Sequence, residues 1–243
     1  MSEPHVVVVD DHEALSSAGA AFVAEVIDDR PAASIVVATG RTPMGIYAEL
    51  ATRVRENRCD PSGITAIQLD EYLGLEPDDR RSLFGWMRRS FLDPLGIEDE
   101  RVVRLPRAGD LDEACADVDR SIASRGGLDL AILGLGLNGH LGFNEPPTER
   151  AAPTRRVALT PATIEANARY WGTQDDVPTE ALTLGLGPLL AARSILLVVS
   201  GEAKRPIAHR ALEGEVCPEV PASFLQETSG VTVIVDRAAW EDA

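Results

Sequence analysis

The stretch 134–146 carries the side chains best suited to proton chemistry. It places Asn138, His140 and Glu145 among four glycines, directly after the mainly apolar run 128–133. A histidine titrates near neutral pH and can shuttle protons, and a neighbouring carboxylate can assist it. Polar residues on a glycine-rich turn at the carboxyl end of a buried strand are typical of α/β active sites.

Two other interpretations of this stretch fit less well. The spacing Gly-x-Gly-x-x-Gly over 134–139 matches the dinucleotide fingerprint, but the prolines at 146–147 follow too soon for the required helix, and no acidic residue lies about twenty residues further on. A metal site needs three or four protein ligands, but this stretch offers only His140 and Glu145 and has no paired-histidine spacing. The sequence therefore predicts no metal site.

Two adjacent carboxylates, Asp70 and Glu71, follow the predicted strand 64–69. In an open α/β sheet the substrate lies beyond the carboxyl ends of the strands, so one of these groups can serve as a general base. The alternative is a pair of solvated loop acids.

A third candidate follows the predicted strand 34–38. Gly40 permits a sharp turn, Thr42 is predicted to cap a helix and Pro43 suits the first helical position. Free backbone amides at a helix start, together with the helix dipole, favour a phosphate group. No Walker motif is present, and a plain capped helix start is the alternative.

Two separate basic residues complete the candidates. Arg169 lies in a poorly patterned region, and Lys204 follows the apolar strand 194–199 in the first turn of a predicted helix. A cation there opposes the helix dipole, and a bound anion would offset that cost. An ordinary surface lysine is the alternative.

The elements that must position these residues alternate between strands and helices. We expect an α/β protein with a single domain, in which a mainly parallel sheet is covered by helices on both faces. The region 146–178 resists assignment and is either a mobile lid or a long surface connection. Strands are predicted at 6–9, 34–38, 64–69, 102–105, 128–133, 194–199 and 231–235, and helices at 12–27, 43–55, 82–92, 111–124, 202–213 and after Asp236.

Composition narrows the class of partner. The 243 residues carry a formal net charge of −16, which argues against nucleic acid and anionic membranes but not against a small anion bound by local cations. No apolar run reaches membrane-spanning length, and the amino terminus lacks the pattern of a secretion signal. Three scattered cysteines, Cys59, Cys115 and Cys217, favour a reducing cytoplasm.

Taken together, these motifs resemble the glucosamine-6-phosphate deaminase (isomerase) family. Its fold is a modified Rossmann-like fold, shared with the 6-phosphogluconolactonases. Those lactonases resemble this chain in the Thr-Pro loop, at Gly139-His140 and over 221–226, but they lack the Asn-Glu-Pro continuation present here at 144–146. The matching segments, in order, are 39–45, 69–75, 136–146, 181–187 and 201–204.

The resemblance implies conversion of glucosamine 6-phosphate and water to fructose 6-phosphate and ammonia, a step of amino-sugar and N-acetylglucosamine catabolism. His140 would assist ring opening, with Asn138 and Glu145 orienting it, and Asp70 would move a proton between C2 and C1. Neither step needs a metal or an organic cofactor. The groups implied to hold the phosphate are Thr39, Gly40, Arg41, Thr42, Arg169 and Lys204.

The chain departs from the family pattern at four places. Asn138 stands where many members have Asp, and Arg41 replaces a small residue in the phosphate loop. The stretch 76–83 lacks the His-Pro-x-Ser-Tyr pattern common in deaminases. The residues implied to bind an allosteric activator in hexameric members correspond here to 148–149 and 155–157, so we expect no activation by N-acetylglucosamine 6-phosphate.

Three alternatives remain open at this stage. The first is a hydrolase of the lactonase type, and the second is the same isomerase chemistry on another sugar phosphate, such as galactosamine 6-phosphate. The third is a non-catalytic sugar-phosphate sensor. Related bacterial repressors carry a helix-turn-helix before this domain, and a first strand that begins at Val6 is expected to leave no room for such a motif. The chain is expected to be a monomer or a homo-oligomer.

Overall fold

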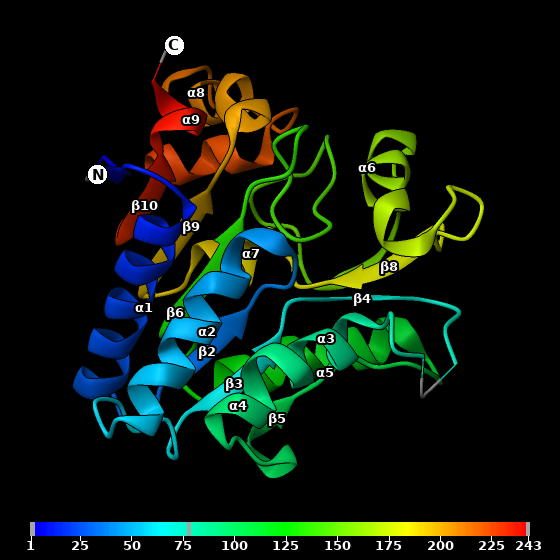
Figure 1. Ribbon diagram of the computed structural model, residues 1–243. Coiled ribbons are helices and arrows are strands. Elements are labelled where there is room, and N and C mark those ends of the chain that lie inside the picture. Colours follow the sequence, from blue (N-terminus) through cyan, green and yellow to red (C-terminus); the bar gives the residue numbers. More distant parts are fainter. Residues whose placement is uncertain (1–2, 77–78, 242–243) are drawn as a thin grey trace.

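The computed structural model describes residues 3–76 and 79–241 and confirms the α/β class. Pro77 and Asp78 of the stretch 76–83 lie outside the described residues. A seven-stranded parallel sheet forms the centre, in the order β1-β10-β9-β6-β2-β3-β5 (Figure 1). Its strands are β1 (His5–Val9), β2 (Ser34–Val37), β3 (Thr65–Gln68), β5 (Val102–Val103), β6 (Leu130–Gly134), β9 (Ser194–Val199) and β10 (Val231–Asp236).

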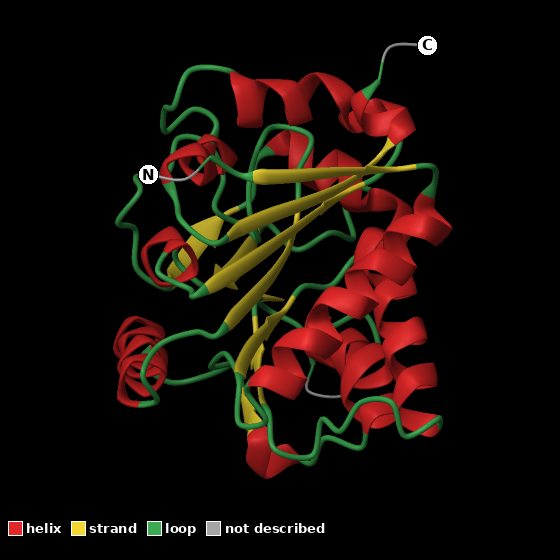
Figure 2. Cartoon of the chain, turned by 90° about the vertical axis from the view of Figure 1, so that its left-hand side faces the viewer, coloured by secondary structure: helices red, strands yellow, loops and turns green. Residues whose placement is uncertain are grey.

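Helices cover both faces of this sheet, as Figure 2 shows. One face packs against α1 (His12–Asp29), α2 (Arg41–Arg55), α3 (Leu83–Met87), the π-helical turn Arg88–Leu92 and α4 (Asp93–Leu95). The other face packs against α5 (Leu111–Ser124), α7 (Leu186–Leu190), α8 (Arg205–Glu213), the 3-10 helix Pro221–Glu227 and α9 (Arg237–Trp240). A further 3-10 turn spans Asp99–Arg101.

Successive residues of the central strands enter opposite cores. Ile132 and Leu196 belong to the core beneath α1 and α2, whereas Leu133 and Leu197 belong to the core beneath α5 and α8. All four side chains are fully buried. This two-sided burial explains why the strands read as continuous apolar runs in the sequence.

A smaller antiparallel sheet stands beside the main one and was not predicted. It consists of β4 (Asp70–Tyr72), β8 (Glu180–Thr183) and β7 (Arg155–Ala158), in the order β4-β8-β7. Above it, α6 (Pro161–Trp171) stands to one side of the main sheet (Figure 1). The apolar cluster between them includes Tyr72, Leu83, Phe143, Leu159, Trp171, Val177 and Ala181.

The start of α2 corrects one prediction. Thr42 does not cap this helix, because the helix already begins at Arg41 and Gly40 is its N-cap, without any side-chain hydrogen bond. Gly40 has a φ of 114°, a conformation that glycine adopts at little cost. Pro43 consequently occupies the third helical position rather than the first.

Other helices, such as α1 and α9, begin at a side-chain cap. The side chain of Asp11 accepts hydrogen bonds from the backbone amides of Glu13 and Ala14 at the start of α1. Asp236 accepts from the amide of Ala239 at the start of α9. The region 146–178, by contrast, is more regular than predicted, because it contains β7 and α6.

Candidate active site

The carboxyl ends of neighbouring parallel strands meet at one edge of the sheet, and a cavity of about 1280 Å³ opens there. Its walls come from the loops after β2, β6 and β9, from β4 and α3, and from α6. Every predicted site residue except Glu145 lines it: Thr39, Gly40, Arg41, Thr42, Asp70, Asn138, His140, Arg169 and Lys204. The tertiary structure thus collects residues that lie far apart in the sequence.

Glu145 lies behind the cavity wall and connects two of these residues. Its Oε2 accepts a hydrogen bond from Asn138 Nδ2 at 2.7 Å and lies 3.4 Å from His140 Nδ1. The backbone amide of His140 in turn donates to Asn138 Oδ1 at 3.2 Å. The three polar residues of the glycine-rich loop therefore form one hydrogen-bonded group.

The glycines of this loop allow the histidine ring to lie close to the backbone. A Cβ atom at Gly136 would lie 2.3–2.5 Å from three atoms of the His140 ring, which is too close for any side chain. The loop is closed by the Gly136 amide, which donates to the His140 carbonyl oxygen at 3.0 Å. We infer that Gly136 is needed for the ring orientation.

The charge of Glu145 is maintained by its partners. Burial by itself raises the pKa of this carboxyl group, but the hydrogen bond and the charge of His140, together with Asn138, outweigh burial and lower the pKa to about 2. An ionised Glu145 accepts the Nδ1 proton of His140 and so directs the other ring nitrogen, Nε2, to act as the exchanging atom. The residues Asn138, His140 and Glu145 are called the relay below.

Asp70 presents a carboxyl group with a raised proton affinity. The side chain is 8% exposed, and Oδ1 is buried without a hydrogen-bond partner among the described residues. Burial, and then the negative charge of Glu71, raises the pKa of Asp70 to about 8. A buried carboxylate with no partner is a strong base once it is ionised, which suits proton abstraction.

The cavity lining also contains cationic groups. Lys204 is the only lysine of the 243 residues, and its ammonium group donates to the Leu135 carbonyl oxygen at 2.6 Å. Burial, and then the charge of Arg169, lowers the pKa of Lys204 to about 8. A bound phosphate group would offset both effects, because it would supply negative charge beside the half-buried Lys204 and the exposed Arg169.

Lys204 ends a 3-10 turn, Glu202–Lys204, that precedes α8. Gly40, which also lines the cavity, is the N-cap of α2, and no side chain caps the first amides of this helix. Arg41 is exposed and lines the same cavity. The amides and cations that the sequence predicted for a phosphate therefore line one cavity, and their binding role stays a prediction.

Several residues that line the cavity were not predicted from the sequence. Arg81 lies over the Trp171 ring, 4.5 Å from its centroid, and Trp86 packs edge-on against Tyr170 at 5.3 Å. These contacts join α3 and the residues just before it to α6, although the partners lie far apart in the sequence. No local pattern could have paired them, because the contact depends on how the two elements fold together.

His12 was also missed. Its Nε2 lies 3.1 Å from the carbonyl oxygen of Thr42, and the side chain lines the cavity from the first turn of α1. It therefore braces the loop that is predicted to hold the phosphate.

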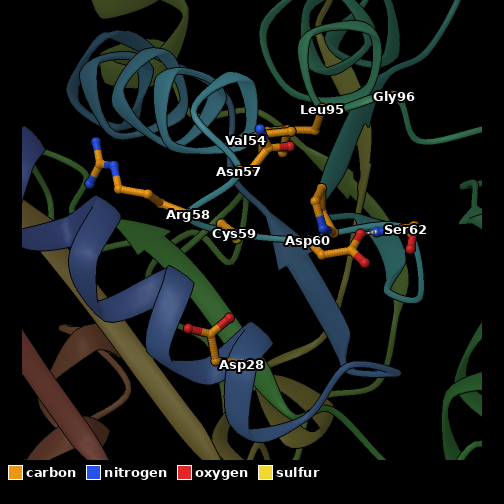
Figure 3. A pocket seen from close by; sticks show the side chains of 10 residues that line it. Asp28, Val54, Asn57, Arg58, Cys59, Asp60, Ser62, Leu95 and Gly96 are labelled. Carbon is orange, nitrogen blue, oxygen red and sulfur yellow. Dashed lines mark hydrogen bonds between the residues drawn. The ribbon is translucent and has the colours of Figure 1, made fainter.

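A second hollow, of about 540 Å³, lies at the opposite edge of the sheet, beside the amino end of β3. Figure 3 shows that its side chains come from α1, from the loop after α2 and from the end of α4. Burial, and then the charges of Asp28 and Asp60, raises the pKa of the Cys59 thiol. An unreactive thiol between two carboxylates does not suit an anionic substrate, so we take the larger cavity as the candidate active site.

Two absences apply to residues 3–76 and 79–241. No group of three or more His, Cys, Asp or Glu side chains is arranged to hold a metal ion. Over the same residues, none of the helices has the length and apolar character needed to cross a membrane.

Comparison with known proteins identifies the class to which this fold and cavity belong. The family model described as glucosamine-6-phosphate isomerases/6-phosphogluconolactonase matches residues 10–234. The chain belongs to this family. It is 42% identical to glucosamine-6-phosphate deaminase of Rhodopirellula baltica, an alignment that covers 96% of this chain and 93% of that protein. It is 39% identical to the enzyme of the same name from Bacillus velezensis, covering 97% and 98%.

Solved structures agree with this membership. A monomeric glucosamine-6-phosphate deaminase superposes with a TM-score of 0.94 at 37% identity, covering 97% of this chain and 98% of that one. The 6-phosphogluconolactonase of Trypanosoma brucei gives a TM-score of 0.76 at 20% identity, covering 98% of both chains. The second likeness shows a shared fold only.

Proposed function

We propose that this protein is a glucosamine-6-phosphate deaminase, which converts glucosamine 6-phosphate and water to fructose 6-phosphate and ammonia. The observation that carries the proposal is one cavity that contains an unpaired Asp70, the His140 end of the relay and the cationic pair Arg169 and Lys204. The curated relatives with this name, at 39% and 42% identity, support the same reaction.

Ring opening is assigned to His140. Glu145 holds the Nδ1 side of the ring, and Nε2 then takes the proton of the anomeric hydroxyl group and delivers it to the ring oxygen. This proton transfer breaks the bond between C1 and the ring oxygen and leaves an aldehyde at C1. Asn138 keeps Glu145 in place by its 2.7 Å hydrogen bond.

Isomerisation is assigned to Asp70. The aldehyde makes the proton on C2 acidic, so the Asp70 carboxylate removes it while O1 takes up a proton from water, and an enol with an amino group at C2 forms. The protonated Asp70 then returns the proton to C1 and the amino group releases one proton to water, which gives an imine at C2 and a hydroxymethyl group at C1. Water adds to this imine and ammonia leaves, so the ketone of fructose 6-phosphate results.

The phosphate group is assigned to the other end of the cavity. The amides and side chains of 39–42, with Arg169 and Lys204, would bind it, and each charge-assisted hydrogen bond is worth roughly 1.5–3 kcal/mol. This binding energy holds C2 of the sugar against Asp70, which lowers the entropic cost of proton transfer. None of these steps requires a metal or an organic cofactor.

We assign to the region 146–178 the role of a lid over this cavity. Its helix α6 carries Arg169 and contributes the cavity wall around Ala162 and Tyr170. A helix that binds the phosphate and also covers the sugar would exclude water while the enol exists.

The reaction belongs to amino-sugar catabolism, including that of N-acetylglucosamine, and we place it in the cytoplasm. The substrate is a phosphate ester, which does not cross a bilayer readily. The three cysteines, Cys59, Cys115 and Cys217, are all free thiols, as a reducing compartment favours.

The test is an assay of the purified protein with separate additions of glucosamine 6-phosphate, galactosamine 6-phosphate and 6-phosphogluconolactone. We expect equal amounts of ammonia and fructose 6-phosphate from the first compound. Ammonia from galactosamine 6-phosphate alone would change the assigned sugar. Loss of the lactone without ammonia release from either amino sugar would replace the deaminase by a hydrolase.

A further inference from the structure

Glu71 is the second carboxylate of the Asp-Glu pair, and the proposed reaction does not use it. It is 1% exposed and, unlike Asp70, it does not line the cavity. Both residues lie on β4, where neighbouring side chains point to opposite sides of the strand. Glu71 therefore cannot act as the base, and a buried carboxylate in this position needs another explanation.

The two oxygens of Glu71 accept four hydrogen bonds from N–H groups. Oε1 accepts from the amides of Tyr72 at 3.0 Å and Leu83 at 2.9 Å. Oε2 accepts from the amide of Phe84 at 3.1 Å and from Gln68 Nε2 at 3.0 Å. A carboxylate has about four acceptor positions, so its hydrogen-bonding capacity is filled.

These bonds connect two parts of the cavity wall, β4 and the start of α3. Leu83 and Phe84 begin α3, which carries Trp86, whereas Tyr72 belongs to β4 itself. One oxygen of Glu71 thus holds the amides of Tyr72 and Leu83 together. Removing Glu71 would leave these buried amides without acceptors, which destabilises the contact between β4 and α3.

Gln68 extends the connection to the backbone of Asp70. Its Nε2 donates to the carbonyl oxygen of Asp70 at 2.9 Å as well as to Glu71. Its Oε1 accepts from the amide of Leu105 at 3.1 Å. The chain leaves the main sheet between β3 and β4, and Gln68 fixes the direction in which it does so.

We propose, on the basis of the proposed function, that Glu71 is a positioning residue: through Gln68 and the start of α3 it holds β4 in the one orientation that directs the Asp70 carboxyl group at C2 of the sugar. A positioning role of this kind requires that the carboxylate of Glu71 accepts all four hydrogen bonds. A side chain that is shorter or neutral would leave the strand less well fixed.

Glu71 has a second effect on Asp70, through its charge. The groups close enough to interact electrostatically with Asp70 are Glu71 and Tyr72 from β4 and Tyr47 from α2, and burial raises the pKa of both tyrosines above its ordinary value of 10. The negative charge of Glu71 repels the carboxylate of Asp70 and so favours the protonated form of Asp70. Removing that charge should lower the pKa of Asp70.

The experiment compares Glu71→Gln with wild type over pH 5 to 9, measuring kcat and KM for glucosamine 6-phosphate. We expect kcat to fall at least 10-fold, while KM changes less than 3-fold, because the phosphate end is untouched. The acidic limb of kcat/KM should move to lower pH, which loss of packing by itself would not cause. Unchanged kcat, or an acidic limb that does not move, would overturn the proposal.

Two further variants separate position from charge. Glu71→Asp keeps the charge but shortens the side chain, so kcat should fall and the acidic limb should stay in place. If Glu71→Gln does not fold, Gln68→Met tests the positioning effect by itself. We expect kcat to fall at least 3-fold, while the acidic limb of kcat/KM stays in place. A wild-type kcat in this variant would refute the positioning role of Glu71. The control for general destabilisation is Asp129→Asn. The carboxylate of Asp129 accepts a hydrogen bond from the Ser34 amide at the opposite edge of the sheet, away from the cavity.

Failure of this proposal differs from failure of the proposed function. If wild type releases no ammonia from glucosamine 6-phosphate, the function is wrong. If wild type is active and all three Glu71 and Gln68 variants match it, only the role of Glu71 is wrong.

Discussion

The ammonium group of Lys204 lies 2.6 Å from the carbonyl oxygen of Leu135, although 69 positions separate the two residues. Leu135 follows β6, and Lys204 follows β9, which pairs with β6 in parallel. The contact therefore crosses the carboxyl edge of the sheet and directs the single lysine of the chain into the cavity.

This placement predicts the behaviour of Lys204→Ala. KM for the sugar phosphate should rise about 10- to 100-fold, as the loss of one charged hydrogen bond of ~1.5–3 kcal/mol implies. Steady-state kinetics measure this, with Arg205→Ala as the matched control, because Arg205 also carries a positive charge but lies outside the cavity lining and donates to the Ala238 carbonyl oxygen. A near-normal KM for Lys204→Ala would remove this residue from the phosphate site.

The single lysine also permits a chemical test. An amine-directed reagent can modify only Lys204 and the amino terminus, and a pKa of about 8 leaves part of the Lys204 amine unprotonated near neutral pH. We expect such a reagent to inactivate the protein, and inorganic phosphate to slow the inactivation. Mass spectrometry would locate the adduct; full activity with Lys204 modified would contradict the assignment.

Asp70→Asn should abolish turnover and yet stabilise the fold. The folded pKa of about 8 lies above the ordinary value of 3.8, so the stability that Asp70 contributes is fully present below pH 4 and is lost as pH rises through 8. Asparagine does not titrate. The melting temperature of the variant should therefore be several degrees higher than that of wild type at pH 8, because each kcal/mol of stability shifts it by ~2–4 °C. Near pH 4 the two proteins should melt at nearly the same temperature.

Calorimetry at both pH values measures this difference. Binding of an acyclic amino-alditol 6-phosphate to Asp70→Asn supplies the control, since the phosphate end of the cavity is intact. A variant that melts lower than wild type at pH 8 would show that the burial of a charged Asp70 costs the fold little.

His140→Gln should impair ring opening more than binding. We expect kcat to fall at least 100-fold, because glutamine cannot take up a proton near neutral pH. Affinity for the acyclic amino-alditol 6-phosphate should change less than 3-fold, since that compound has no ring to open. Titration calorimetry measures the affinity, and equal losses in kcat and affinity would assign His140 to binding instead.

Activation by N-acetylglucosamine 6-phosphate is not expected. Arg155, one of the residues that correspond to the activator site of hexameric relatives, is already engaged: its guanidinium group donates to Asn144 Oδ1 at 2.8 Å and to Thr148 Oγ1 at 3.2 Å. Initial rates at a low concentration of substrate, with and without this compound, test the expectation. A saturable increase in rate would refute it.

Much of the fold was predictable because it depends on local pattern. The helix 111–124 and the strand 194–199 have the bounds that were predicted. Their apolar spacing and flanking residues specify them without any distant partner. The antiparallel strands β4, β7 and β8 escaped prediction because each is only three or four residues long and is specified by its pairing with the others.

The sequence by itself determined which chemical groups are available and that parallel strands would bring their carboxyl ends to one edge of the sheet. Only the tertiary structure decided that Asp70 faces the cavity while Glu71 turns into four N–H groups, because that choice depends on where α3 begins relative to β4. It also decided that Oε2 of Glu145 serves both Asn138 and His140. Local propensity specifies elements, whereas long-range packing specifies which side chains meet.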